Sequence, residues 1–224
     1  MHNNLLEFVS NTNEKRICIV GAGGFGREVF CIITDVFRAY SKDISDRVCF
    51  MVGDKHYEDK EIMGIPVIRQ SEFQPSNFFT SIAIGDPEQR KSMVDSLPFE
   101  TEYISIIHPS AIVSSWVEIG LGSIITAGVI MTCNIKIGKH AQLNLNTTIG
   151  HDCNMGDFFT TAPGVNVSGH CEFGNQVYFG TNSSVRQGIT ITDNVTIGMG
   201  GVVVKNITES GVYIGNPLKK LEKK

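Results

Sequence analysis

A strict six-residue period of apolar residues runs through the second half of the chain. Stepping by six from Ile107 to Val203 meets an apolar residue at sixteen of seventeen positions, with Thr161 as the exception. The residue that follows is usually small, most often glycine. No helix repeats every six residues, but a short flat strand plus a tight corner does, and three such units close a triangular coil of 18 residues. The period therefore predicts a parallel β-helix with one apolar side chain per side in its narrow interior.

Such coils stack at the usual strand spacing of ~4.8 Å, so residues 18 positions apart become neighbours. Cys153 and Cys171 have this spacing, and we expect them to lie in line as small packed side chains. None of the six cysteines forms a C-x-x-C pair, which argues against a zinc ribbon or a thioredoxin-like motif. We expect reduced thiols.

The first half of the chain has a different pattern. Residues 1–105 hold only 7 of the 23 glycines, and apolar strand-like runs alternate there with helical segments. Strands are expected at 16–21, 47–54, 64–68, 78–86 and 101–107, and helices at 26–40 and 87–97. This alternation predicts a parallel sheet with crossover helices. The chain should thus comprise a small Rossmann-like α/β domain, residues 1–105, followed by a β-helix domain, residues 106–224.

A glycine-rich turn of the form G-x-G-x-x-G, residues 21–26, joins the first strand to the first helix. Such a turn brings backbone N–H groups and a helix N-terminus to a phosphate, or it simply lets the strand and helix pack closely. Only about 90 residues are available, and the nearest acid beyond the second strand, Asp54, comes 28 positions after Gly26. This favours a nucleotide sugar or mononucleotide over NAD. The candidate ligand-binding residues are Gly23, Gly24, Phe25, Asp54, Asp86 and Arg90, and Asp86 is alternatively a helix cap before Pro87.

Charge and hydropathy exclude several classes of protein. The formal net charge is -4, and no basic run precedes the final LKKLEKK, which argues against a nucleic-acid binder. No apolar run approaches the ~18 residues of a membrane helix, and the N-terminus lacks the features of a signal peptide. We therefore expect a cytoplasmic protein that does not insert into a membrane.

Several segments together carry a resemblance to a known family: GAGGFG at 21–26, AIGDPEQR at 83–90, HPSAIV at 108–113, IGHDC at 149–153, APGVNVSG at 162–169 and GNPLKK at 215–220. With the six-residue repeat, the chain resembles the hexapeptide-repeat acyltransferases that O-acetylate sialic acid or N-acetylate nucleotide-linked amino-sugars. The resemblance implies left-handed coils and a homotrimer that binds acetyl-CoA between neighbouring prisms. It also implies that the N-terminal domain holds the nucleotide of the substrate.

The resemblance places the chemistry at His151. This residue lies two positions after the inward-facing Ile149, at or near a corner, and Asp152 completes the His–acid pair of the family. An imidazole, with an ordinary pKa near ~6.5, is suited to take the proton of the attacking nucleophile. The family supplies an oxyanion donor from a glycine one coil later, which is Gly169 in this chain, 18 positions after His151. No metal ion is required.

The resemblance also implies the contacts to acetyl-CoA. The expected residues are Asn144, Thr160, Gly169, Gly180, Ser183, Gly215, Pro217 and Lys219. Thr160 stands where the family often has a second histidine, so His170 either compensates or is an incidental surface residue. Leu218 replaces the alanine of the family's G-x-P-A-K loop, and Lys219 and Lys220 are alternatively part of a solvated tail.

The expected function is acetyl-CoA-dependent N-acetylation of a nucleotide-linked 4-amino-sugar. The same chemistry on a hydroxyl, as in O-acetylation of sialic acid, remains an alternative. A metalloenzyme would need His140, His151 and His170 on one edge, and their spacings of 11 and 19 do not provide this. A non-catalytic scaffold is a third alternative, against which the His–Asp pair and the CoA-like loop argue.

Overall fold

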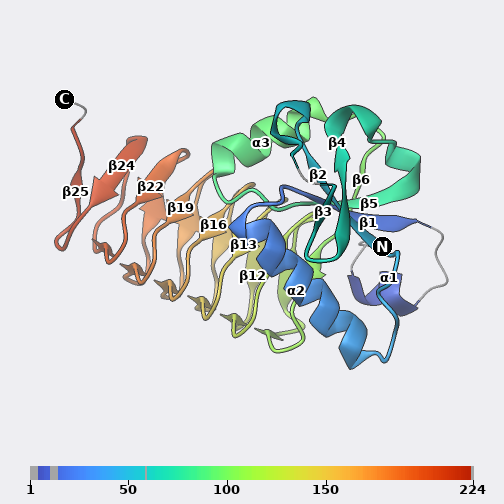
Figure 1. Cartoon of the computed structure of the whole chain (residues 1–224). Helices are drawn as coiled ribbons and strands as arrows, with labels where there is room; N and C mark the ends of the chain where they lie inside the picture. The colour runs from blue at the N-terminus through green and yellow to red at the C-terminus, as the bar shows by residue number, and fades with distance from the viewer. Residues whose placement is uncertain (1–4, 11–14, 59, 223–224) are drawn as a thin grey trace. The chain divides into compact units, whose positions relative to one another are not determined.

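The structure is a computed structural model that describes residues 5–10, 15–58 and 60–222 (Figure 1). The described chain divides into two compact units. One contains the residues up to Gly85 together with 89–109 and 121–124, and the other contains 86–88, 110–120 and the chain from Ile125 onward. The two units correspond to the two sequence patterns, a sheet with helices and a stack of coils.

The first unit is built on a sheet with the strand order β3-β4-β2-β1-β5-β6. All neighbours pair in parallel except β3 and β4. The strands are β1 (Arg16–Val20), β2 (Val48–Val52), β3 (Glu61–Ile62), β4 (Ile65–Arg69), β5 (Phe78–Ile82) and β6 (Glu102–Tyr103). The helices are α1 (Leu5–Ser10), α2 (Gly24–Ala39) and α3 (Pro87–Ser96), with 3-10 turns at Asp54–His56, Gln70–Glu72 and Pro75–Asn77. The predicted parallel α/β sheet is confirmed.

Burial explains why these segments form this layered structure. The apolar run of β1 is buried along almost its whole length, as expected for a central parallel strand. Helix α2 is amphipathic, and its apolar stripe, which includes Val29, Ile33 and Phe37, belongs to the same core as β1 and β2. The sheet and α2 thus bring the carboxyl end of β1 and the start of α2 together at the glycine-rich turn.

The second unit is a left-handed parallel β-helix with three faces, as predicted (Figure 1). The first face contains β10 (Ile124–Ile125), β13 (Gln142–Leu143), β16 (Thr160–Thr161), β19 (Tyr178–Phe179), β22 (Val195–Ile197), β24 (Gly211–Ile214) and β25 (Lys219–Lys220), in a sheet that begins with β7 (Ile106–Ile107). The second face contains β8 (Ile112–Val113), β11 (Ile130–Met131), β14 (Thr148–Ile149), β17 (Asn166–Val167), β20 (Ser184–Val185) and β23 (Val202–Val203). The third face contains β9 (Val117–Ile119), β12 (Ile135–Ile137), β15 (Asn154–Met155), β18 (Glu172–Phe173) and β21 (Thr190–Ile191).

The register between coils is 18 residues on every face from β8 to β23, and it is 16 residues between β22 and β24. Ile130 pairs with Thr148, Lys136 with Asn154, and Gln142 with Thr160. The six-residue series fills the interior, where Met131, Ile149, Val167 and Val185 are all buried.

The polar exception in the series, Thr161, is also buried, and its hydroxyl has polar partners inside the coil. Its Oγ1 lies 2.8 Å from Oγ1 of Thr147 and accepts the N–H of Asn144 at 3.1 Å. A buried hydroxyl is tolerated when it is hydrogen-bonded. The break in the apolar pattern therefore does not break the coil.

Three corners connect the faces, the third of which returns from the third face to the first, as between β15 and β16. The first corner joins the first face to the second, as between β13 and β14, and the second corner joins the second face to the third, as between β14 and β15. Small residues are needed where coils approach closely: a Cβ at Gly138 would lie 2.5 Å from the carbonyl carbon of Gly156. The predicted stacking of Cys153 and Cys171 is confirmed, because the Cys171 N–H donates to Sγ of Cys153 at 3.4 Å. In the described part of the chain, no helix is long and apolar enough to cross a membrane.

Candidate active site

The second corner carries a column of residues with left-handed backbone. Asn134, Asp152 and His170 occupy equivalent positions in successive coils, with φ values of 52°, 57° and 57°. Asparagine, aspartate and histidine are the side chains most often found in this conformation. The 18-residue register stacks them along one edge, and His151 lies beside them.

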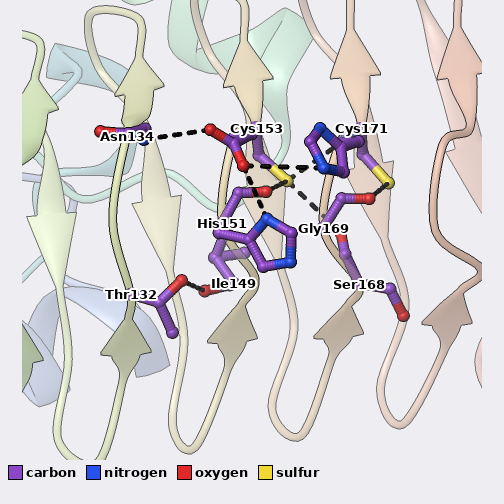
Figure 2. Close-up of polar contacts among 10 residues, drawn as sticks. Thr132, Asn134, Ile149, His151, Cys153, Ser168, Gly169 and Cys171 are labelled. Carbon is purple, nitrogen blue, oxygen red and sulfur yellow. Dashed lines mark hydrogen bonds and ion pairs between the residues drawn. The ribbon is translucent and has the colours of Figure 1, made fainter.

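Asp152 is the centre of this polar group, which Figure 2 draws with its members Asn134 and His151 labelled. One carboxylate oxygen, Oδ2, lies 2.7 Å from Nδ1 of His151, and the other, Oδ1, accepts the side-chain amide of Asn134 at 3.1 Å. Nε2 of His170 lies 3.7 Å from Oδ2. The hydrogen bond from His151, and after it the one from Asn134, holds the pKa of Asp152 below its usual value. The carboxylate is therefore ionised at neutral pH and orients the imidazole.

This arrangement sets the tautomer of His151. Because Nδ1 faces an ionised carboxylate, the ring proton resides on Nδ1, and Nε2 carries the free lone pair. The His151 side chain is about half exposed, at 48%. The ring can thus act as a general base through Nε2 toward a ligand from solvent.

Gly169 lies directly beside this ring. A Cβ at position 169 would be 2.7 Å from both Nε2 and Cε1 of His151, so a side chain there would displace the imidazole. Within the described residues, the N–H of Gly169 has no hydrogen-bond acceptor. The structure brings together His151, Asp152 and Gly169, the three residues that sequence reasoning placed in the chemistry. A donor without an intramolecular partner next to a base is suited to bind a developing oxyanion.

The spacings of His140, His151 and His170 predicted that these three residues do not share one edge of the β-helix, and the structure agrees. His151 and His170 lie at the same corner, with ring centroids 4.8 Å apart and planes at 88°. His140 belongs to another column and stacks on Phe158 at 5.3 Å. The convergence of Asn134 and His170 on Asp152 was not predicted, although their 18-residue spacing is the signal that could have revealed it.

The N-terminal unit contains a separate cavity of about 410 Å³ at the carboxyl ends of β1 and β2. Its lining includes Gly21, Ala22 and Gly23 of the glycine-rich turn. A Cβ at Gly26 would lie 1.9 Å from the carbonyl oxygen of Gly21, so Gly26 is a packing glycine. At Gly23 and Gly24, by contrast, a Cβ would meet nothing within 4 Å. Packing therefore does not explain these two glycines.

The other residues predicted for the nucleotide lie in different settings. The Asp54 carboxylate accepts hydrogen bonds from the hydroxyl and N–H of Ser71, which lower the pKa of Asp54. Arg90 is fully buried and donates to the carbonyl oxygens of Ile84 and Gly85 at 2.7 and 3.1 Å. Phe25 is partly buried in the core of α2 and the sheet, and Asp86 is exposed.

Sequence reasoning missed two polar residues of the cavity, His56 and Glu58. His56 is the last residue of the 3-10 turn Asp54–His56, and Glu58 lies two residues after it. The signal that could have revealed them is a cluster of polar residues directly after the second parallel strand, where ligands bind in such sheets.

The residues predicted for acetyl-CoA are spread over several parts of the β-helix. Asn144, Gly180 and Ser183 each follow a strand of the first face, and the loop of Gly215 and Pro217 follows β24, with a cis bond between Asn216 and Pro217. The Ser183 side chain is fully buried, and the Thr160 hydroxyl donates to the carbonyl of Phe158 at 3.1 Å. Lys219 is exposed in β25, and Lys220 pairs with Glu209 at 2.9 Å. His151 stands at the second corner, so of the residues predicted for acetyl-CoA the structure brings only Gly169 directly beside it within the described chain.

A left-handed β-helix with a His–Asp pair on its edge, preceded by a Rossmann-like domain with a cavity at its glycine turn, defines a hexapeptide-repeat acetyltransferase. Comparison with known proteins agrees. Residues 16–97 match the family model described as the PglD N-terminal domain. The chain is 27% identical over 175 residues to a GDP-perosamine N-acetyltransferase of Escherichia coli O157:H7, covering 76% of this chain and 78% of the relative.

Two solved structures extend the likeness to nearly the whole chain. The acetyltransferase domain of PglB from Neisseria gonorrhoeae FA1090, in complex with acetyl coenzyme A, has a TM-score of 0.82 at 26% identity and covers 93% of this chain and 100% of that one. PerB from Caulobacter crescentus, in complex with CoA and GDP-perosamine, has a TM-score of 0.81 at 27% identity, with 94% and 99% covered. The matching model, the relative and the two solved structures together support the nucleotide-sugar acetyltransferase family.

Proposed function

We propose that this protein transfers the acetyl group of acetyl-CoA to the amine of a nucleotide-linked 4-amino-sugar of the 4-amino-4,6-dideoxyhexose type, for surface glycan biosynthesis. The observation that carries the proposal is the 2.7 Å contact between Nδ1 of His151 and Asp152, with Gly169 against the same ring. Relatives over most of the chain are an amino-sugar N-acetyltransferase and proteins solved with acetyl-CoA or with CoA and GDP-perosamine. The protein is an acetyl-CoA-dependent sugar acetyltransferase.

The reaction is a direct transfer. Nε2 of His151 takes a proton from the amine as its nitrogen attacks the thioester carbonyl, and Asp152 stabilises the imidazolium that forms. The Gly169 N–H donates to the oxyanion of the tetrahedral intermediate. As the intermediate collapses, the C–S bond breaks, and the CoA sulfur takes the proton from His151. Because the amine attacks the thioester directly, no covalent enzyme intermediate is required.

The working form is a homotrimer. Asn144, Gly180 and Ser183, which are predicted to contact acetyl-CoA, lie at the first corner, whereas His151 and Gly169 stand at the second corner, across the second face. A thioester held at the first corner of one chain can reach His151 of another chain if the prisms pack side by side. The second face exposes Ile112 and Ile130 on neighbouring strands, an apolar patch suited to such packing.

The cavity beside Gly23 and Gly24 holds the nucleotide of the substrate. Its position at the carboxyl ends of β1 and β2 is where parallel sheets bind phosphorylated ligands. The backbone N–H groups at the start of α2 provide donors for the diphosphate. The compartment we propose is the cytoplasm, where acetyl-CoA is available.

The test is a screen of nucleotide-linked 4-amino-sugars carrying guanine, uracil or thymine, each with acetyl-CoA, with thiol release and product mass as readouts. Hydroxyl acceptors, including sialic acid, are assayed in parallel, because His151 could deprotonate a hydroxyl in the same way. We expect saturable thiol release and a mono-N-acetylated product with at least one amino-sugar. Thiol release with hydroxyl acceptors alone would replace N-acetylation by O-acetylation.

A further inference from the structure

The second corner places a second histidine next to the His151–Asp152 pair. Nε2 of His170 lies 3.7 Å from the same carboxylate oxygen, Oδ2, that contacts Nδ1 of His151. A ligand atom from each of the three side chains lies within 4.8 Å of the others. Of these three side chains, the proposed acetyl transfer uses those of His151 and Asp152. His170 is therefore a polar group that the mechanism leaves unexplained.

Two imidazole nitrogens and one carboxylate oxygen are a donor set that suits zinc and related divalent transition metals. Zinc bonds of ~2.0–2.2 Å place tetrahedral ligands ~3.3 Å apart. The observed separations of 2.7 Å and 3.7 Å about Oδ2 fall on either side of this value. All three side chains are between a third and just over a half exposed, so small rotations suffice to bring them to one ion. The exposed side leaves room for water as a further ligand.

The backbone holds this donor set in place. Asp152 and His170 both have left-handed φ values at equivalent positions of consecutive coils, and the His170 N–H donates to the His151 carbonyl at 2.8 Å. The three Cα atoms are thus fixed by the coil stacking rather than by a mobile loop. Elsewhere in the described ranges, no other group of three histidine, cysteine or acidic side chains comes together in this way.

We propose that His151 Nδ1, Asp152 Oδ2 and His170 Nε2 form an inhibitory binding site for a divalent transition metal, with Zn²⁺ as the best fit. Coordination through Nδ1 moves the single ring proton of His151 from Nδ1 to Nε2, without net gain or loss of a proton. Nε2 then has no lone pair with which to accept the proton of the amine. An occupied site is therefore inactive, and removal of the metal restores the base.

The claim that this site binds a metal ion does not depend on the reaction. The claim that the bound metal inhibits acetyl transfer rests on the proposed function. His170→Asn is the informative variant, because asparagine is well tolerated at a φ of 57° and removes an imidazole ligand. His108→Asn is the matched control. His108 also lies near a carboxylate, at 3.3 Å from Asp35, but this pair is not part of a three-ligand group in the part of the chain that the structure describes.

The first experiment is calorimetric titration of chelator-treated protein with Zn²⁺ alone. Cys31 and Cys133 are changed to serine in every variant, since both thiols are exposed and would bind zinc themselves. We expect one Zn²⁺ per chain in the parent and in His108→Asn, and at least 10-fold weaker binding in His170→Asn. Absence of binding in the parent, or equal affinity in His170→Asn, would overturn the site.

The second experiment measures acetyl transfer at buffered free Zn²⁺ concentrations. We expect turnover of the parent to fall in step with zinc occupancy and to return on chelation, while His170→Asn needs at least 10-fold more zinc for the same loss. Full turnover by zinc-occupied parent would overturn the inhibition. If no acceptor is acetylated even without metal, the proposed function fails, and the calorimetric result still decides whether the site exists.

Discussion

The imidazole of His151 lies against Gly169, where a Cβ would come within 2.7 Å of Nε2. Gly169 does not have a left-handed φ, so alanine fits its backbone and the clash with the ring is the whole effect. We expect Gly169→Ala to lower kcat roughly 10²-fold by displacing the base and the oxyanion donor. Ser168→Ala, one residue earlier, is the control and should retain near-normal kcat. Steady-state kinetics measure this. A Gly169→Ala enzyme with unimpaired kcat would show that Gly169 does not contribute to catalysis.

Asp152 gives a pH-dependent prediction. Its pKa is lowered in the folded protein, chiefly by His151, so its ionised form stabilises the fold above the ordinary value of 3.8, and this contribution is lost as the pH falls through the lowered pKa. We expect Asp152→Asn to lower Tm at pH 7 and to differ less from the wild type near pH 2. Thermal melts at both pH values measure this. A Tm difference that grows on acidification would contradict the assigned direction.

The glycine-rich turn predicts a selective effect on one substrate. Gly23→Trp should raise KM for the nucleotide sugar far more than KM for acetyl-CoA, because position 23 is open and bulk there blocks approach of the diphosphate. Gly26→Ala is the contrasting variant and should lower Tm, since its Cβ would collide with the Gly21 carbonyl. Equal increases in both KM values for Gly23→Trp would show that the turn is only structural.

The trimer predicts the effect of a charge on the second face. Light scattering of the wild type should give the mass of three chains of 24.6 kDa. Ile130→Glu should shift the protein toward monomer and lower activity, because it places a carboxylate in the apolar patch with Ile112. Lys136→Glu on the third face is the control. A monomeric wild type at working concentration would remove the basis for a site shared between chains.

Much of the fold was predictable because each side of a coil places one apolar residue in the interior, which produces the six-residue period. Each buried position repeats with the geometry, so the register of Met131 on Ile149 follows from counting. Thr161 breaks the pattern, and only the structure shows that its hydroxyl is satisfied by Thr147 and Asn144. Helix α1 was not predicted, because its six residues are too few to show a helical period.

The site was predictable in part. The adjacent pair His151–Asp152 is visible as a motif, but the side-chain direction that puts Nδ1 on the carboxylate is a property of the left-handed corner at Asp152. The approach of His170 depends on that same corner in the next coil. Glu58 in the N-terminal cavity depends on a 3-10 turn without a periodic signal. Chemistry carried by corners and turns is therefore less visible in sequence than chemistry carried by strands.

The most direct test of the account is the kinetics of His151→Ala. A half-exposed corner side chain fills no core space, so the oligomeric state should stay that of the wild type and any loss of Tm should not exceed that of Asp152→Asn, which breaks the same contact. We expect kcat to fall roughly 10²-fold or more, the usual contribution of a positioned base, while acetyl-CoA affinity changes only a few-fold. Retention of most of the wild-type kcat at saturating amino-sugar would contradict His151 as the base.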